Sequence, residues 1–375
     1  MKKVLVVDDS ALMRKLLMGV LREGGYEVTS ARNGAEGVDM VVQWQPDVVT
    51  LDINMPEMDG LTALSLMMAA RPTPVIMVSS LTEKGALATF EALALGAVDF
   101  IAKPGGTISL HVDDIAKVLL DKVRSASRAR VGGVRRAITA TQKPMARPAP
   151  VREALPAAFP AAAAPAARLR EPATSKALAQ RPAGLVLIGV STGGPRTLED
   201  ILPKLPADFP WPVLVAQHMP ANFTDTFARR MDSLCALNVV EVAAGMPLEA
   251  GKVYIGRGGT DLTVVDRGGR LHAAPRPETP AVLWHPSVEI LVDTAMQHMP
   301  PQRLVGVMLT GMGNDGAAAM TRLHRAGGRT IAESQETAVV FGMPQELIEL
   351  GGASMVLPCT GVATQLRAWL LRKAA

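Results

Sequence analysis

Residues 3–9, KVLVVDD, join a short apolar run to two aspartates. Two lysines precede the run, as in an export signal, but a signal-peptide core needs about 7 to 15 apolar residues. An apolar run of only about four residues, closed by carboxylates, is typical of a buried β-strand. We therefore expect a strand over residues 3–7 that ends in polar side chains.

Four similar apolar runs follow, and each is separated from the next by a stretch with helical periodicity. Further strands are expected at 27–30, 48–52, 75–79 and 98–102. Helices are expected at 11–23, 35–44, 60–70, 84–95 and 112–125. This alternation predicts a five-stranded, parallel, doubly wound sheet with helices on both faces. In such a sheet, functional groups gather at the carboxyl ends of the strands.

The stretch 124–183 interrupts the pattern, because its many prolines leave neither helical nor alternating apolar periodicity. It predicts a flexible Ala/Pro/Arg-rich linker between domains at 1–123 and 184–375. The linker holds twelve Lys or Arg and two Glu, a net charge of +10, whereas the whole chain has a net charge of +4. The flanking domains are therefore acidic together, which argues against nucleic acid as a partner.

Beyond the linker, strand–helix alternation resumes and predicts a second α/β domain. Strands are expected at 185–190, 213–217 and 304–309, and helices at 223–234, 287–298, 315–326 and from Pro195. A β-rich stretch interrupts them, with short runs at 239–242, 253–255, 262–265 and 270–273. We expect a mostly parallel sheet that carries an antiparallel β insertion.

The sequence also indicates the cellular compartment in which the protein is found. No apolar run approaches the roughly 18 to 20 residues that a membrane span needs. The two cysteines, Cys235 and Cys359, lie far apart and share no CxxC spacing. Unpaired thiols are typical of a reducing compartment. We expect a cytoplasmic protein without membrane insertion.

Polar side chains end four strands of the first domain: Asp8 and Asp9, then Asp52, then Ser79, and finally Lys103. Carboxylates that converge at one edge repel one another, so the cluster is typical of an oxygen-ligand site for Mg²⁺. A carboxylate beside Mg²⁺ can attack a phosphoryl donor and become an acyl phosphate. Ser79 would then hydrogen-bond the phosphoryl oxygens, and Lys103 would pair with their charge. Helix capping explains each aspartate alone, but not the set.

Four segments resemble the motifs of bacterial response-regulator receiver domains: VLVVDDSALMR (4–14), VTLDINMPEMDG (49–60), VIMVSSLT (75–82) and DFIAKP (99–104). This resemblance implies that Asp52 is the phosphoacceptor and that Asp8 and Asp9 lie at the metal. Phe100 stands where that family carries an aromatic switch residue, although plain core packing is the alternative.

The second domain begins with LVLIGVSTGGP at 185–195. This segment predicts a strand, a Gly-rich turn and a Pro in the first turn of a helix. Within it, Ser191 matches the G-x-S-x-G nucleophile elbow. A dinucleotide-binding turn has a similar outline, so an NAD-type oxidoreductase stays open as an alternative. A dinucleotide site, however, favours an acidic residue about 20 residues on.

The next strand instead ends in Gln217 and His218, and an imidazole there suits a general base facing Ser191. Asp315 follows the strand at 304–309 and can orient that imidazole, while the Gly-rich backbone beside it offers N–H groups to an oxyanion. No His, Cys or Glu pair has zinc-ligand spacing, so we expect no cofactor for this chemistry.

The order Ser, His, Asp differs from that of α/β-hydrolases. Five segments are similar, in order and spacing, to the chemotaxis protein-glutamate methylesterase family (CheB): IGVSTGGP (188–195), VAQHMPANFTDTFARRMD (215–232), HPSVEILVDTAM (285–296), LTGMGNDGAAAM (309–320) and ESQETAVVFGMP (333–344). The resemblance maps the family's triad onto Ser191, His218 and Asp315, and an oxyanion donor onto the backbone N–H of Met312.

This resemblance implies hydrolysis of glutamate methyl esters, and deamidation of glutamines, on methyl-accepting chemoreceptors. It implies a phosphorylation-regulated enzyme, with a histidine kinase as phosphodonor. We expect the protein to be a monomer. A non-catalytic scaffold that binds receptors is the alternative from another functional class.

Overall fold

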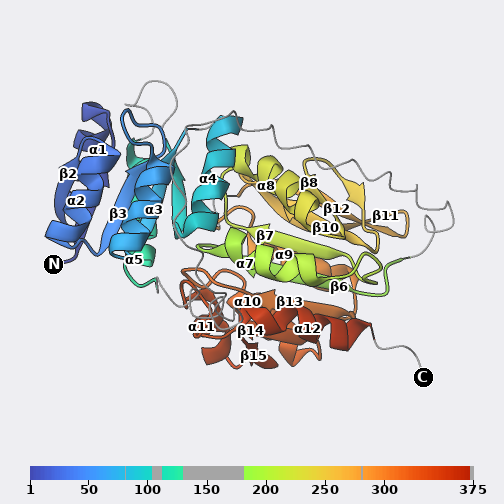
Figure 1. The fold of residues 1–375 in the computed structure, drawn as a ribbon. Coiled ribbons are helices and arrows are strands. Elements are labelled where there is room, and N and C mark those ends of the chain that lie inside the picture. The colour runs from blue at the N-terminus through green and yellow to red at the C-terminus, as the bar shows by residue number, and fades with distance from the viewer. Residues whose placement is uncertain (81, 104–111, 130–180, 280–281, 372–375) are drawn as a thin grey trace, which may run out of the picture.

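The computed structural model describes residues 1–80, 82–103, 112–129, 181–279 and 282–371, and they form two α/β domains that pack against each other (Figure 1). Nearly all of the linker expected at 124–183 lies outside the described residues, so it stays a prediction. Helix α5 continues to Ala126, three residues past the expected end of the first domain.

The first domain is the predicted doubly wound sheet, with the strand order β2-β1-β3-β4-β5 and parallel pairing throughout. Its strands are β1 (Lys3–Val7), β2 (Glu27–Ala31), β3 (Val48–Asp52), β4 (Val75–Ser79) and β5 (Asp99–Ala102). Its helices are α1 (Ala11–Glu23), α2 (Gly34–Trp44), α3 (Gly60–Ala70), α4 (Glu83–Leu95) and α5 (Val112–Ala126).

Successive residues of β1 supply two separate cores, as the two-residue period of a strand requires. Val4 and Val6 pack with α1 and α5, whereas Leu5 and Val7 pack with α2, α3 and α4. Burial on both faces explains why the run is continuously apolar rather than alternating.

The second domain is built on a seven-stranded parallel sheet with the order β15-β14-β13-β6-β7-β10-β8. Its strands are β6 (Leu185–Val190), β7 (Val213–Gln217), β8 (Asn238–Val242), β10 (Lys252–Gly256), β13 (Leu304–Met308), β14 (Arg329–Glu333) and β15 (Met355–Leu357). Its α-helices are α7 (Gly194–Ile201), α8 (Ala221–Leu234), α9 (Val288–His298), α10 (Ala317–Arg325), α11 (Met343–Glu349) and α12 (Cys359–Leu370). Short 3₁₀ helices follow α7 at Leu202–Lys204 and precede β13 at Pro301–Arg303.

The predicted antiparallel insertion is confirmed as a separate three-stranded sheet. It contains β9 (Met246–Pro247), β11 (Thr260–Arg267) and β12 (Arg270–Pro277) in the order β11-β12-β9. The runs at 239–242 and 253–255, grouped with this insertion in the sequence, belong instead to β8 and β10 of the parallel sheet. Short β-branched runs carry no signal of pairing direction, which is why the sequence did not separate them.

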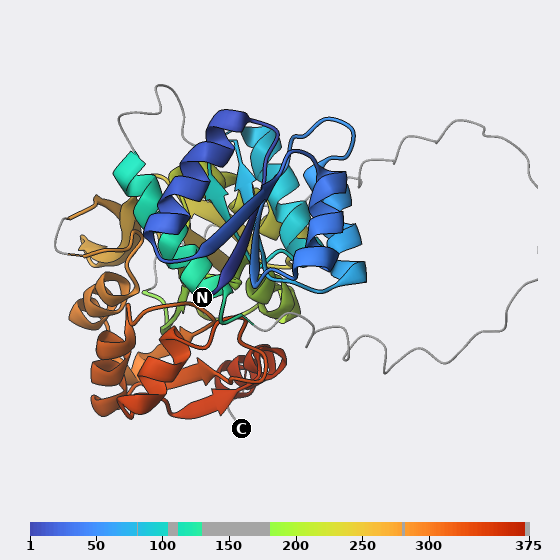
Figure 2. The same cartoon turned by 90° about the vertical axis from the view of Figure 1, so that its left-hand side faces the viewer.

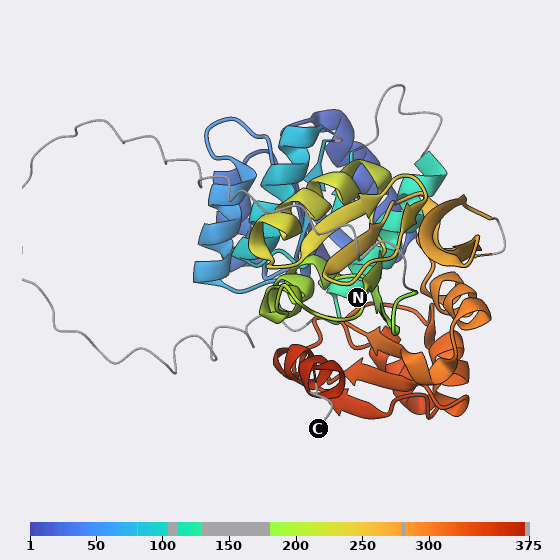
Figure 3. The same cartoon turned by 90° about the vertical axis from the view of Figure 1, so that its right-hand side faces the viewer.

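The two domains share a hydrophobic interface that α4 and β5 form with α8 (Figure 1). Phe90 of α4 packs on Phe227 of α8, with ring centroids 5.5 Å apart. Phe100 of β5 packs on Phe223 of the same helix, with centroids 4.4 Å apart. Seen from two opposite sides, the first domain lies in front of the second in Figure 2 and behind it in Figure 3, as the side-by-side arrangement of Figure 1 requires.

Candidate active site

Strand register brings Ser191 and His218 to the same edge of the parallel sheet. Val190, the last residue of β6, lies opposite Gln217, the last residue of β7. Each candidate residue immediately follows its strand, and the His218 N–H donates to Val190 O at 3.0 Å. Ser191 and His218, 27 residues apart in the chain, are therefore neighbours because the two strands are parallel and their last residues are paired.

The turn after β6 is held by hydrogen bonds to the main chain of Ser191. Its N–H donates to Thr310 O at 2.9 Å, and its carbonyl accepts from Gly194 N at 2.8 Å and from the Gln217 amide at 2.9 Å. Gly193 has a φ of 81°, which disfavours a side chain. A Cβ at Gly193 would also lie 2.6 Å from Val339, so this sharp turn requires glycine.

The imidazole of His218 is oriented from two sides. Its Nε2 lies 2.9 Å from Asp315 Oδ2, and the indole of Trp284 stacks on the ring at 5.2 Å with an interplanar angle of 9°. The other nitrogen, Nδ1, is buried without a hydrogen-bond partner. No hydrogen bond joins Ser191 to His218 among the described residues, an arrangement common in substrate-free sites.

Asp315 is held by the amino end of α9 as well as by His218. Its Oδ2 accepts from Val288 N at 2.7 Å, and its Oδ1 accepts from Ser287 Oγ at 2.9 Å and Glu289 N at 3.2 Å. Burial raises the pKa of Asp315, but the His218 hydrogen bond and the helix amides outweigh it and hold the pKa below its usual range. A carboxylate that stays ionised in this way can stabilise a charged imidazole.

The loop that carries Met312 approaches Ser191 closely. A Cβ at Gly311 would lie 2.7 Å from Ser191 Cβ, so only glycine lets the loop come this near. Gly311 itself is fixed by hydrogen bonds with Val340 and Met343. In the described part of the chain, the Met312 N–H has no acceptor, which leaves it available to an oxyanion.

The acidic pocket of the first domain assembles as the sequence indicates. Asp8 and Asp52 are each 1% exposed, and Lys103 Nζ lies 3.1 Å from Asp8 and 2.7 Å from Asp52. Burial, together with the charge of Asp8, raises the pKa of Asp52 even though Lys103 opposes the change. Burial lowers the pKa of Lys103, but Asp52 and Asp8 outweigh it, so that pKa is raised overall.

A divalent cation fits this pocket. Ligand oxygens of Asp8, Asp9 and Asp52 all lie within 4.8 Å of one another, and such an all-oxygen set suits Mg²⁺. Ser79 is buried near the pocket, but its hydroxyl donates to Gly85 O at 3.1 Å and has no hydrogen bond to Asp52. The phosphoryl-sensing role of Ser79 thus stays a prediction.

The pocket strand β5 also reaches the Ser191 turn. Asp99 accepts a hydrogen bond from the hydroxyl of Thr192 at 2.6 Å through one oxygen, and pairs with Lys122 at 2.6 Å through the other. Its neighbour Phe100, 3% exposed, packs on the helix that follows His218. The two candidate sites are therefore joined through two adjacent residues of one strand.

Comparisons with known proteins identify the families of the two domains. Residues 4–113 match the response regulator receiver domain, and residues 186–366 match the CheB methylesterase. The chain is 53% identical over 373 residues to protein-glutamate methylesterase/protein-glutamine glutaminase 3 of Rhodospirillum rubrum, covering 99% of this chain and 97% of that protein. The chain belongs to the CheB methylesterase family.

A second relative and a solved structure are also similar to this CheB family chain. The protein-glutamate methylesterase/protein-glutamine glutaminase 2 of Rhodopseudomonas palustris is 52% identical and covers 98% of each chain. The crystal structure of the Thermotoga maritima CheB methylesterase catalytic domain is 39% identical, with a TM-score of 0.48, over 50% of this chain and 98% of that one. In the described ranges, no helix of this CheB relative has the length and apolar character of a membrane span.

Sequence reasoning missed several side chains that shape the site of this CheB relative. Trp284 precedes α9 and Ser287 is the N-cap of that helix; both contact the His218–Asp315 pair, although neither follows a strand or belongs to an elbow motif. Glu333, at the end of β14, is fully buried and accepts from Thr310 N at 2.8 Å and Thr337 Oγ1 at 2.9 Å. Its place at a strand end was the one signal that could have found it.

The buried carboxyl of Glu333 makes a pH-dependent contribution to stability. Burial raises its pKa from 4.5 to about 7, so the folded protein binds this proton more tightly than the unfolded chain does. The contribution of protonated Glu333 to the free energy of unfolding is therefore fully present below the pKa of the unfolded chain. It is lost as the pH rises through the folded-state pKa of about 7.

We predict that Glu333→Gln, which is neutral at every pH, raises the melting temperature at about pH 8 but not at about pH 5. Thermal unfolding of both proteins across this range measures the difference. The matched control Glu336→Gln, at a position whose side chain is not buried, leaves the pH dependence unchanged. Equal melting curves for the parent and Glu333→Gln at both pH values contradict the assignment.

Proposed function

We propose that Ser191, His218 and Asp315 are the catalytic triad of a protein-glutamate methylesterase that also deamidates glutamines. The observation that carries the proposal is the state of His218. Asp315 holds one ring nitrogen at 2.9 Å, while the other is buried without a partner beside the strand end that bears Ser191. A neutral imidazole that donates from Nε2 keeps its lone pair on Nδ1, where a general base needs it.

In the acylation half, His218 Nδ1 takes the proton of the Ser191 hydroxyl as Oγ attacks the ester carbonyl. The negative charge that develops on the carbonyl oxygen is met by the free N–H of Met312. Asp315 stabilises the imidazolium that forms. Collapse of the tetrahedral species breaks the bond to the methoxy oxygen, which takes the proton from His218 and leaves as methanol.

In the deacylation half, His218 removes a proton from water, and the resulting hydroxide attacks the glutamyl ester of Ser191. Ser191 recovers its proton, and a free glutamate side chain is released. A glutamine substrate passes through the same acyl-enzyme and releases ammonia instead of methanol. Both substrates share one acyl centre, so one triad serves both reactions.

The receiver domain is proposed to control access to this site through acyl phosphate formation at Asp52. Asp8, Asp9 and Asp52 would hold Mg²⁺, which would supply charge neutralisation for phosphoryl transfer when bound. Lys103 already pairs with the Asp52 carboxylate. A phosphoryl group on Asp52 would compete with that carboxylate for the Lys103 ammonium. The contacts of Asp99 with Thr192 and of Phe100 with Phe223 support coupling between β5 and the Ser191 turn.

The partners follow from the family membership. We propose methyl-accepting chemoreceptors as substrates, a histidine kinase as the phosphodonor of Asp52, and the cytoplasm as the compartment where both are met. No step of the proposed hydrolysis uses a metal, because the residues around Ser191 supply both the base and the oxyanion donor.

We predict that Ser191→Ala lowers methanol release from methylated receptor membranes by about a millionfold, since the nucleophile is lost. Thermal unfolding and receptor binding stay close to those of the parent. Ser334→Ala, which removes a buried hydroxyl from the chain segment after β14, is the matched control and keeps its turnover. Near-normal methanol release from folded Ser191→Ala protein rules out the triad.

We predict that Asp52→Ala removes stimulation by a small phosphodonor and leaves the basal rate within a few-fold, because no acyl phosphate forms. Initial rates of methanol release with and without phosphodonor measure this. The control Asp47→Ala removes a carboxylate that pairs with Lys2 elsewhere in the receiver, and stimulation persists. If Asp52→Ala is still stimulated several-fold, the phosphoacceptor lies at another residue.

A further inference from the structure

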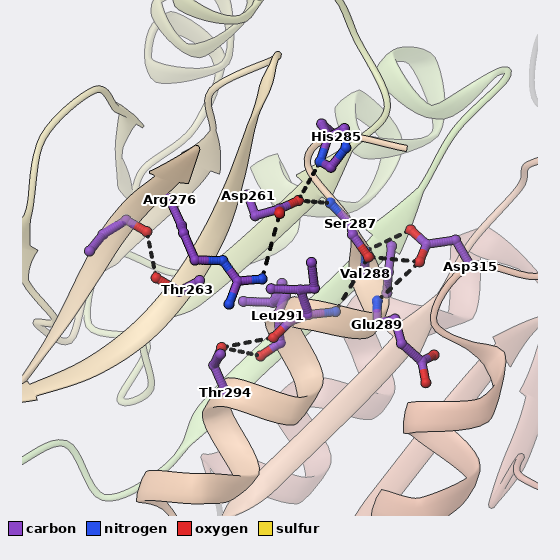
Figure 4. Close-up of polar contacts among 12 residues, drawn as sticks. Asp261, Thr263, Arg276, His285, Ser287, Val288, Glu289, Leu291, Thr294 and Asp315 are labelled. Carbon is purple, nitrogen blue, oxygen red and sulfur yellow. Dashed lines mark hydrogen bonds and ion pairs between the residues drawn. The ribbon is translucent and has the colours of Figure 1, made fainter. Parts of the chain in front are cut away.

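Ser287 is placed to fix the carboxylate of Asp315. It is the N-cap of α9, fully buried, and its Oγ accepts a hydrogen bond from Ile290 N at 3.3 Å. A hydroxyl has a single proton, and that of Ser287 is donated to Asp315 Oδ1 at 2.9 Å (Figure 4). The capping role and the contact with Asp315 therefore use different parts of one side chain.

The main chain of Ser287 is anchored by a second buried carboxylate. Asp261 of β11 is fully buried, and its Oδ1 accepts from Ser287 N at 3.0 Å and lies 2.8 Å from His285 Nδ1. Arg276, its partner across the β11–β12 pair, lies 3.7 Å from Oδ2. Figure 4 shows Ser287 between Asp261 and Asp315. The antiparallel insertion thus provides a fixed support for this serine.

The contacts of Asp315 decide which of its oxygens faces His218. Oδ2 accepts a hydrogen bond from Val288 N and lies beside His218 Nε2. Oδ1 accepts hydrogen bonds from Ser287 Oγ and, at the longer distance of 3.2 Å, from Glu289 N. Without the Ser287 hydroxyl, Oδ1 keeps only the longer bond from Glu289 N, so the carboxylate is held less firmly against turning about its Cβ–Cγ bond. Such a turn removes the alignment of Oδ2 with the imidazole.

We propose that Ser287, held in place by Asp261, is a positioning residue of the hydrolase: its hydroxyl keeps Asp315 aligned with His218. The proposal rests on the triad proposed above. It differs from a capping role alone, because loss of a cap lowers stability and leaves turnover unchanged, whereas loss of alignment lowers kcat with little effect on KM.

The test compares Ser287→Ala with Thr294→Val in the full chain, with phosphodonor and methylated receptor membranes. Thr294 belongs to the same helix, shares its one hydroxyl proton between Ile290 O and Leu291 O, and accepts from Val264 N, but it has no hydrogen bond to Asp315. We expect Ser287→Ala to lower kcat about tenfold to a hundredfold, as loss of a hydrogen bond to a charged group does, with KM within about twofold. We expect Thr294→Val to lower the melting temperature and to keep its kcat.

Asp315→Asn separates failure of this proposal from failure of the triad. If Asp315→Asn loses about 10⁴ in turnover while Ser287→Ala keeps its kcat, Ser287 is a helix cap only and the proposal is overturned. Equal losses of kcat in Ser287→Ala and Thr294→Val overturn it as well, because they trace the effect to helix stability. If Asp315→Asn itself keeps its turnover, the triad is wrong and the proposal falls with it.

Discussion

The parallel register of β13, β6 and β7 is the constraint on which the rest of the structure depends. Met308 pairs with Gly189, and Val190 pairs with Gln217, so three strand ends lie side by side at one edge. The segments that follow them supply Asp315, Ser191 and His218, the proposed triad, from distant parts of the chain. A slip of β6 by one residue would turn Ser191 to the other face of the sheet and separate it from His218.

The same edge also explains how one domain reaches the other. The Ser191 turn and the start of α8 follow adjacent strands, and the receiver covers both of them with one short strand. Asp99 contacts Thr192 and Phe100 contacts Phe223, while Lys103, just past β5, pairs with Asp52. Lys103, which pairs with Asp52, is therefore only three or four residues along the chain from two of the contacts between the domains.

Strand ends were the part that the sequence predicted well. Asp8, Asp52 and Lys103 meet as expected, and His218 meets Asp315, because buried strands with terminal polar residues leave few alternatives in a parallel sheet. Ser287 lies at the start of a helix that the sequence predicts, but its contact with Asp315 and the stacking of Trp284 on His218 could not be predicted, since both depend on the packing of α9 against β11 rather than on local pattern. The Phe100–Phe223 contact depends on how two domains dock, which no single segment encodes.

The most direct test of whether Ser191 is a nucleophile activated by His218 is to label the full chain with a fluorophosphonate and to locate the label by peptide mass spectrometry. The account predicts that the label is found on Ser191, that it is acquired faster after phosphodonor is added, and that His218→Ala prevents it. A label on another serine, or equally fast labelling of Ser191 in His218→Ala, would contradict it.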